Sequence, residues 1–519
     1  MAPLRTIGQR LASSLSRAKQ LRKRDQELLS KEACIDVVGT GGTLTAAYEQ
    51  LRNAAENSEE HLLIQNAIKR FYRQLFLTGD KKLVGDGDEL IIELTQAGYV
   101  PNNTLRKAQS TEISQKATAY FELYEKLKKD RSVSDITALH WVVEVLAVEV
   151  ANIVQPQYED LAFVELAYEY FASIIPESVA EKTDDFGAAL FVAVHQALLK
   201  SDIALIRSQL LGRYNIKPNQ PKVFVEYNLR IDELIEKPII DELYHTVDRQ
   251  GAPLRIIRRM IATDDNLPEL IGKRSAFLNA FENQVSQEYS RISSRINRAV
   301  VRSVIFLIIT KVLIGVAIEV PYDLMTNGEV AWMPLTINLL FPPVYMILLR
   351  STLTMPGSIN TSALTERIDT ILYANNKVTL SKLEIGQKRY SMAFSVVYGV
   401  TSLVILGLVA WALLALQFTF VHIIIFVIFI SAASFLSFRL GHMVRELELV
   451  RSKSNFVTMI RDFVYLPFVV LGQWMSDKYS KLNIITIMLD MLIEMPLKTI
   501  LRLLRQWNAF IDDRKDNLV

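Results

Sequence analysis

The residues with the clearest chemical potential are two ionisable side chains inside an apolar stretch. Between Val304 and Val320, the charged residues are Lys311 and Glu319. A lysine inside a membrane-crossing helix is costly, so it is a candidate functional residue that needs a partner. Glu319 lies ~12 Å from Lys311 along an α-helix and ~80° around it. We therefore expect Glu319 at the outer interface, and not in a direct pair with Lys311.

The expected partners of Lys311 lie in the next apolar stretch, residues 331–349. If the two stretches form a hairpin, Asn338 and Lys311 lie at similar depths. Pro342 and Pro343 have no N–H, so the carbonyls four residues earlier lose their helical donors. Those carbonyls and the Asn338 amide are predicted acceptors for the Lys311 ammonium. The candidate intramembrane polar site comprises Lys311, Glu319, Asn338, Pro342 and Pro343.

Two interpretations of this candidate site stay open. In the first, the polar groups satisfy one another and hold the hairpin together, or Lys311 extends toward the inner interface. In the second, the groups line a hydrated pathway in which Lys311 changes its charge or contacts an anion.

Four arginines precede the first apolar stretch and form a second candidate site. Arg291, Arg295, Arg298 and Arg302 follow a 4-3-4 spacing, which places them on one face of a helix. Guanidinium groups next to a membrane attract anionic lipid head groups. The alternative is that these charges only orient the chain in the membrane.

Other ionisable residues resemble metal sites only weakly. His140 and Glu144 share one helical face, and His195 follows on a later helix. A metal site in a helix bundle needs further carboxylates on facing helices, and the sequence shows no such pattern. A structural histidine and an i,i+4 ion pair are the preferred interpretations. We expect no metal and no cofactor.

Two glycine-containing segments also lack a complete ligand motif. Gly39–Thr43 misses the Gly-Lys-Ser/Thr end of a phosphate loop, so it predicts a turn before a helix. Asp86 and Asp88 lack the twelve-residue calcium pattern and are expected to cap the following helix. The single cysteine, Cys34, excludes an internal disulfide. No nucleophile motif is present, so the sequence leans away from an enzyme.

The elements that position these residues are predominantly apolar helices. Residues 304–349 form one predicted transmembrane hairpin, and residues 390–438 are free of Lys, Arg, Asp and Glu. A single helix over this second segment would be ~74 Å long against a hydrocarbon core of ~30 Å. The segment must therefore contain two spans, and we predict a turn near Gln417–His422. The total is four spans.

Basic residues flank the predicted spans on one side. The connection 350–389 and the segment after Phe438 are rich in Lys and Arg, whereas 321–332 contains Asp323 and Glu329 but no basic residue. The positive-inside rule therefore places both termini in the cytoplasm.

The remaining chain predicts an all-α fold, in which a large cytoplasmic helical region precedes the four-helix transmembrane region and an amphipathic carboxyl-terminal helix. Phe463–Met475 is apolar but too short to cross the bilayer, so it is either re-entrant or interfacial. The predicted boundaries are 1–24 for a basic amphipathic segment, 25–212 for a helical domain, 213–222 for a linker, 223–303 for a stalk, 304–349 and 390–438 for the hairpins, 350–389 for the connection and 439–519 for the tail.

Several segments resemble an uncharacterised group of multi-pass membrane proteins from small-genome candidate-phyla bacteria. The resemblance is carried by residues 46–54, 59–63, 318–323, 334–338 and 341–343. It implies a bacterial cytoplasmic membrane and no particular activity. The Arg-rich, acid-free first 24 residues leave a mitochondrial presequence, and thus the mitochondrial inner membrane, as the alternative.

The expected function is a membrane-anchored interaction or scaffold protein, because the predicted cytoplasmic part is large and the spans carry few ionisable groups. The alternative is a small channel or transporter that uses the polar groups of the first hairpin. The expected partners are the bilayer, particularly anionic lipids, and a cytoplasmic protein. Lys plus Arg nearly balances Asp plus Glu, at 58 against 56, so nucleic acid is not an expected partner.

Overall fold

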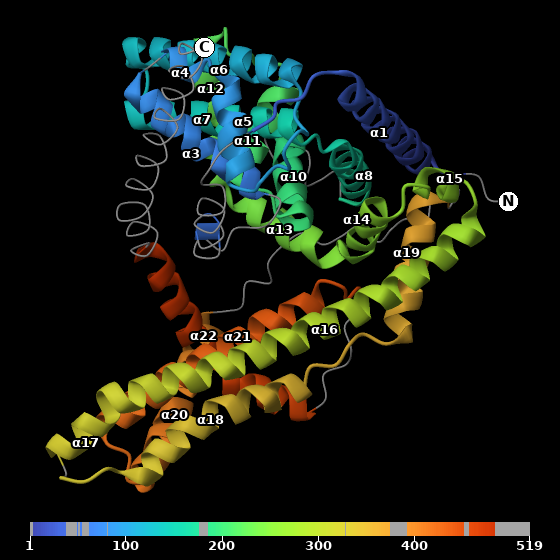
Figure 1. Cartoon of the computed structure of the whole chain (residues 1–519). Helices are drawn as coiled ribbons and strands as arrows, with labels where there is room; N and C mark the ends of the chain where they lie inside the picture. Colours follow the sequence, from blue (N-terminus) through green and yellow to red (C-terminus); the bar gives the residue numbers. More distant parts are fainter. Residues whose placement is uncertain are drawn as a thin grey trace, which may run out of the picture.

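The computed structural model describes residues 4–37, 49, 52–53, 62–79, 81–175, 185–326, 328–373, 392–450 and 456–482. The described parts are helical and contain no strand beyond one isolated bridge between Cys34 and Arg106. This confirms the predicted helical class. The region preceding α16 forms one body, and the most apolar helices extend away from it (Figure 1).

The amino-terminal domain, which we define as α1 to α15, is built around α7 (Asp135–Val154). Helices α3, α6 and α11 pack against α7, and Trp141 is among its fully buried residues. Its helices are α1 Thr6–Lys31, α3 Leu63–Thr78, α4 Lys81–Val84, α5 Gly87–Gln96, α6 Lys107–Asp130, α7, α8 Tyr158–Ile174, α10 Phe186–Val194, the π-helix η2 His195–Leu199, α11 Ile203–Arg213, α12 Pro221–Ile235, α13 Pro238–Gln250, α14 Ala252–Thr263 and α15 Leu267–Ile271.

The basic first helix docks on the same domain. Leu11 and Leu15 are buried, so the apolar face of α1 packs inward against α8 and α15. The basic face contacts acidic residues of these neighbours: Arg10 pairs with Glu169, and Lys19 lies 3.3 Å from Glu269. This helix therefore finds its acidic partners within the chain.

The apolar region begins in the second half of a very long helix. Helix α16 spans Arg274–Ile314 and continues through the π-helix η3 (Gly315–Glu319) into α17 (Val320–Thr326). The helices α18 Trp332–Ser351, α19 Ser358–Leu372, α20 Met392–Ala415, α21 Phe420–Arg445 and α22 Phe456–Leu482 follow. The break between α20 and α21 lies at the turn predicted near Gln417–His422.

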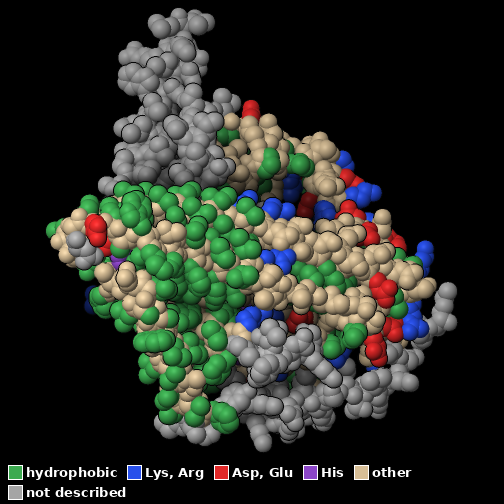
Figure 2. Space-filling view, turned by 90° about the horizontal axis from the view of Figure 1, so that it is seen from below, with side chains coloured by type: hydrophobic (Ala, Val, Ile, Leu, Met, Phe, Trp, Pro, Cys, Tyr) green, Lys and Arg blue, Asp and Glu red, His purple; other side chains and the backbone are tan. Residues whose placement is uncertain are grey.

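Five described helical segments are long and apolar enough to cross a membrane: 135–154, 274–326, 332–351, 396–415 and 420–445. These segments differ in how much of their surface is buried by the rest of the protein. The apolar window of 135–154, which is α7, is 67% buried inside the protein, whereas the window in 396–415 is 6% buried. Figure 2 shows a broad hydrophobic area that is bordered by Lys and Arg side chains. Phe306, Leu313, Leu403 and Trp411 are more than half exposed within these helices.

Helix α16 connects two hydrophobic cores. Near its start, Phe277, Phe281 and Val285 belong to the core of the amino-terminal domain. Further along, Ile296 and Val300 belong to a separate cluster with residues of α21. Helix α16 is therefore a rigid link between both parts.

A buried asparagine braces the same junction. The Asn360 side-chain amide donates to the Leu447 carbonyl and the Tyr289 hydroxyl, at 2.9 and 2.8 Å. Its side-chain oxygen accepts from the backbone N–H groups of Leu449 and Val450. One side chain therefore ties α19, α16 and the chain after α21 together.

The segment Phe463–Met475, predicted as re-entrant or interfacial, lies within the 27-residue helix α22. This helix packs along α21, and its residue Gly472 is buried. A Cβ at this position would come within 3.0 Å of the Ser431 carbonyl oxygen and the Phe435 Cβ. The glycine thus permits the close approach of the two helices.

A polar cluster inside the apolar helices

Lys311 and Glu319 form a buried ion pair. The Lys311 ammonium donates to the Glu319 carboxylate, and their side chains are 3% and 0% exposed. The prediction that Glu319 is a poor direct partner of Lys311 is therefore wrong. The cause is the π-helical turn Gly315–Glu319, in which the Val320 N–H bonds to the Gly315 carbonyl.

The π-helical turn changes the angle that separates Lys311 and Glu319 around the helix axis. It inserts about one extra residue into the helix, so eight residues advance about as far as seven α-helical residues. The angular offset falls from ~80° to ~20°, and the axial separation becomes ~10 Å. Lys311 and Glu319 therefore share a face, and the long lysine chain spans the remaining separation.

Asn338 joins this pair from α18, as depth counting predicted, but its chemical role differs. Its amide donates to Glu319 at 3.5 Å and to the backbone carbonyl of His422 at 3.2 Å. The prediction that the Asn338 amide acts as an acceptor for Lys311 is therefore wrong, because the nearby carboxylate is the stronger acceptor. Pro342 and Pro343 are buried inside the continuous helix α18, and Lys311 donates to Glu319 in place of the carbonyls predicted there.

Two further ionisable residues belong to the cluster and were missed by sequence reasoning. His422 Nε2 lies 3.5 Å from Asp323 Oδ2, and both side chains are fully buried. The His422 Nδ1 contacts the Thr419 hydroxyl at 2.8 Å. Asp323 also accepts from the Ala331 N–H at 3.0 Å, which closes the turn before α18. The available signal was the four-residue spacing of Asp323 from Glu319, which places them on one helical face.

We name these five residues, Lys311, Glu319, Asp323, Asn338 and His422, the polar cluster. It connects the α16–α17 segment with α18 and α21 at the end of the helices that lies far from the amino-terminal domain (Figure 1). Lys311 also lies 5.1 Å from the centre of the Phe429 ring, so an aromatic face shields one side of the ammonium.

The polar cluster has more acceptor atoms than donors. Among the described residues, one oxygen each of Glu319, Asp323 and Asn338 has no hydrogen-bond partner, and neither does His422 Nε2. Buried polar atoms in this state ordinarily bind water or a proton. One lysine and one histidine therefore face two carboxylates in this cluster. The cluster could therefore hold a proton or a water molecule between the helices.

The four predicted head-group arginines divide into two pairs. Arg291 lies 3.7 Å from Glu288 and, with Arg295, lines a large cavity between the two parts of the protein. Arg298 and Arg302 are exposed farther along α16 and are not among the residues that line this cavity.

The residues considered as metal ligands have ordinary structural partners. His140 Nε2 lies 3.2 Å from Glu144, as the spacing predicted. His195 contacts the Ser201 hydroxyl at 3.1 Å, and burial, reinforced by the Arg258 charge, lowers the pKa of His195 to about 4. No group of three His, Cys, Asp or Glu residues suited to a metal occurs within the described ranges.

Asp86 caps α5, because its side chain accepts from the N–H groups of Asp88 and Glu89. This confirms the capping prediction for Asp86, whereas the Asp88 carboxylate accepts from the Ser110 hydroxyl of α6. The segment Gly39–Thr43 lies outside the described residues. Shortly before it, the Val37 N–H donates to the Asn102 side-chain oxygen.

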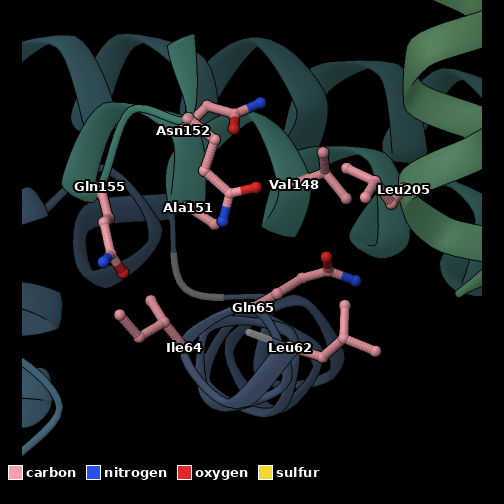
Figure 3. Close-up of a pocket in the computed structure, with 9 residues that line it drawn as sticks. Leu62, Ile64, Gln65, Val148, Ala151, Asn152, Gln155 and Leu205 are labelled. Atoms are coloured by element: carbon pink, nitrogen blue, oxygen red, sulfur yellow. The ribbon is translucent and has the colours of Figure 1, made fainter. Parts of the chain in front are cut away.

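A small cavity between α3 and α7 offers little room for a ligand. Gln65, Asn152 and Gln155 line it together with aliphatic side chains (Figure 3). Its volume of about 20 Å³ accommodates one water molecule. We therefore assign it a structural role.

Comparison with known proteins reveals no relative. The sequence matches no protein family and no curated protein, and the structure matches no solved structure.

Proposed function

We propose that this protein is a multi-pass membrane anchor that holds a large helical interaction domain on the cytoplasmic face of the bilayer. The observation that supports this most is helix α16, which carries buried residues of both hydrophobic cores without interruption. A flexible linker would leave the domain free to move, whereas a continuous helix fixes it to the apolar part.

The proposed spans are the carboxyl-terminal part of α16 with η3, α18, α20 and α21. Helix α7 matches α18 in hydropathy but lies in the core of the amino-terminal domain, so we assign it to that domain. The basic flanks of the spans support a cytoplasmic location for both termini. We propose the cytoplasmic membrane of a bacterium as the location, on the resemblance to membrane proteins of candidate-phyla bacteria, with the mitochondrial inner membrane as the alternative.

A second candidate function is a small channel or transporter that moves protons or ions through the polar cluster. The unpartnered oxygens of Glu319, Asp323 and Asn338 favour it, because a proton or ion pathway needs acceptors that are free. The complete ion pairing of Lys311 favours the anchor instead, since the lysine already has its counter-charge.

Flux measurements on the full protein in liposomes separate the two functions. The anchor predicts no proton, potassium or anion flux above that of empty liposomes. A flux that disappears in the Lys311→Met/Glu319→Met variant would select the transporter and contradict the anchor. A flux that this variant leaves unchanged would contradict the anchor and also place the pathway outside the polar cluster.

A further inference from the structure

A large cavity separates the amino-terminal domain from the apolar helices. Its volume is about 1240 Å³, which exceeds the ~300–1,000 Å³ of most small-molecule sites. Helix α14 forms one wall, and α16 and α21 form the other. The cavity lies where the positive-inside rule places the cytoplasmic surface of the membrane.

The lining of the cavity carries an excess of positive charge. Eight Lys or Arg residues and four Asp or Glu residues line it. The acids already have partners: Glu159 pairs with Arg22, Asp160 with Arg258, and Glu288 with Arg259. Glu446, the fourth acid, lies 3.3 Å from Lys200.

Two arginines are left without an acidic partner. Within the described part of the chain, neither Arg295 nor Arg439 has an ion pair. Their neighbours Ile296 and Leu440 belong to one hydrophobic cluster, so the two arginines approach the cavity from facing helices. Burial alone would raise the pKa of the Glu446 carboxyl. Its contacts with His442, Lys200 and Arg255 outweigh burial and lower that pKa to about 2. The electrostatic field around Glu446 is therefore positive.

The cavity becomes apolar along α21. Phe435 and Leu436 line it one helical turn beyond Arg439, toward the middle of the helix, and Ala299 does so from α16. A ligand that fits this lining has an anionic end and an apolar end. A free anion would leave the apolar wall in contact with water.

We propose that this cavity binds an anionic phospholipid of the cytoplasmic leaflet. The head-group phosphate lies between Arg295 and Arg439, and an acyl chain lies along Phe435 and Leu436. The inference rests on the proposed membrane insertion of the apolar helices. A general attraction of basic residues to the membrane would involve all six arginines that flank the junction on α16 and α21. The proposed site uses two of them, Arg295 and Arg439, together with a shaped cavity.

The test measures lipid retention by the full protein in nanodiscs that contain phosphatidylglycerol and phosphatidylcholine with identical acyl chains. The wild type retains phosphatidylglycerol preferentially, and Arg295→Gln/Arg439→Gln weakens this retention roughly thirtyfold, as expected for two basic groups near the surface. The matched control is Arg298→Gln/Arg302→Gln, which removes the same charge from α16 outside the cavity. It should retain most of the lipid.

Three results would overturn the lipid site. Equal losses in the two double variants would show a diffuse surface attraction. Displacement of the lipid by inorganic phosphate alone would assign the cavity to a soluble anion. Absence of any preference for phosphatidylglycerol, in a protein that resists alkaline extraction from membranes, would reject the site while the anchor stands. Release by alkaline extraction would instead reject the anchor itself.

Discussion

Lys311→Met should destabilise the protein by ~3–5 kcal/mol, because it leaves the Glu319 carboxylate buried without a counter-charge. The Glu319 side chain is fully buried, and the donor that remains among the described residues is the Asn338 amide at 3.5 Å. The free energy of unfolding can be measured by titrating the purified protein from mild detergent into sodium dodecyl sulfate.

The double variant Lys311→Met/Glu319→Met is the matched control for this prediction. It removes both charges and keeps similar side-chain volumes, so its stability should return to within ~1 kcal/mol of the wild type. The Asn338 amide then retains its bond to the His422 carbonyl. If the double variant is as unstable as Lys311→Met, the loss does not come from an unpaired charge and the ion pair is not the stabilising element.

Gly472→Ala should destabilise the packing of α22 on α21 by ~1–3 kcal/mol, as typical for an overpacked contact. The new methyl group would meet the Ser431 backbone, which cannot move without shifting α21. The same unfolding titration measures the effect.

Gly407→Ala on α20 provides the comparison, since no atom of the described residues lies within 4 Å of the added Cβ. Here alanine should leave stability unchanged or raise it by up to ~1 kcal/mol, through its higher helix propensity. Equal effects at the two positions would contradict the close approach of α21 and α22.

The parts of the fold that follow from local rules could be predicted from the sequence. Asp86 and Ser134 each cap the helix that follows, because a side-chain oxygen near the first turn satisfies free N–H groups. Phe281 and Val285 are apolar residues four positions apart, a spacing that indicates one packing face of α16, and both lie in the core. Counting residues inward from the ends of the two predicted spans also placed Asn338 at a depth similar to that of Lys311, and Asn338 lies in the same cluster.

The remaining parts of the polar cluster depend on features that are not local. The π-helical turn at Gly315–Glu319 changes which residues share a face of the helix. A prediction based on regular α-helical geometry does not include this change. Asp323 and His422 lie in or beside segments that charge patterning assigns to the connections between spans, yet tertiary packing buries both residues. The cavity at Arg295 and Arg439 likewise requires two helices to be placed relative to the domain.

The most direct test of the membrane anchor is the accessibility of single cysteines in intact cells. Cys34 is the single cysteine of the chain, so Cys34→Ser supplies a clean background. Glu329→Cys and Ser358→Cys then place a thiol at exposed positions before and after α18. We expect an impermeant maleimide to label Glu329→Cys in intact cells and Ser358→Cys only after permeabilisation. Labelling of Ser358→Cys in intact cells, or protection of Glu329→Cys, would contradict the proposed anchor.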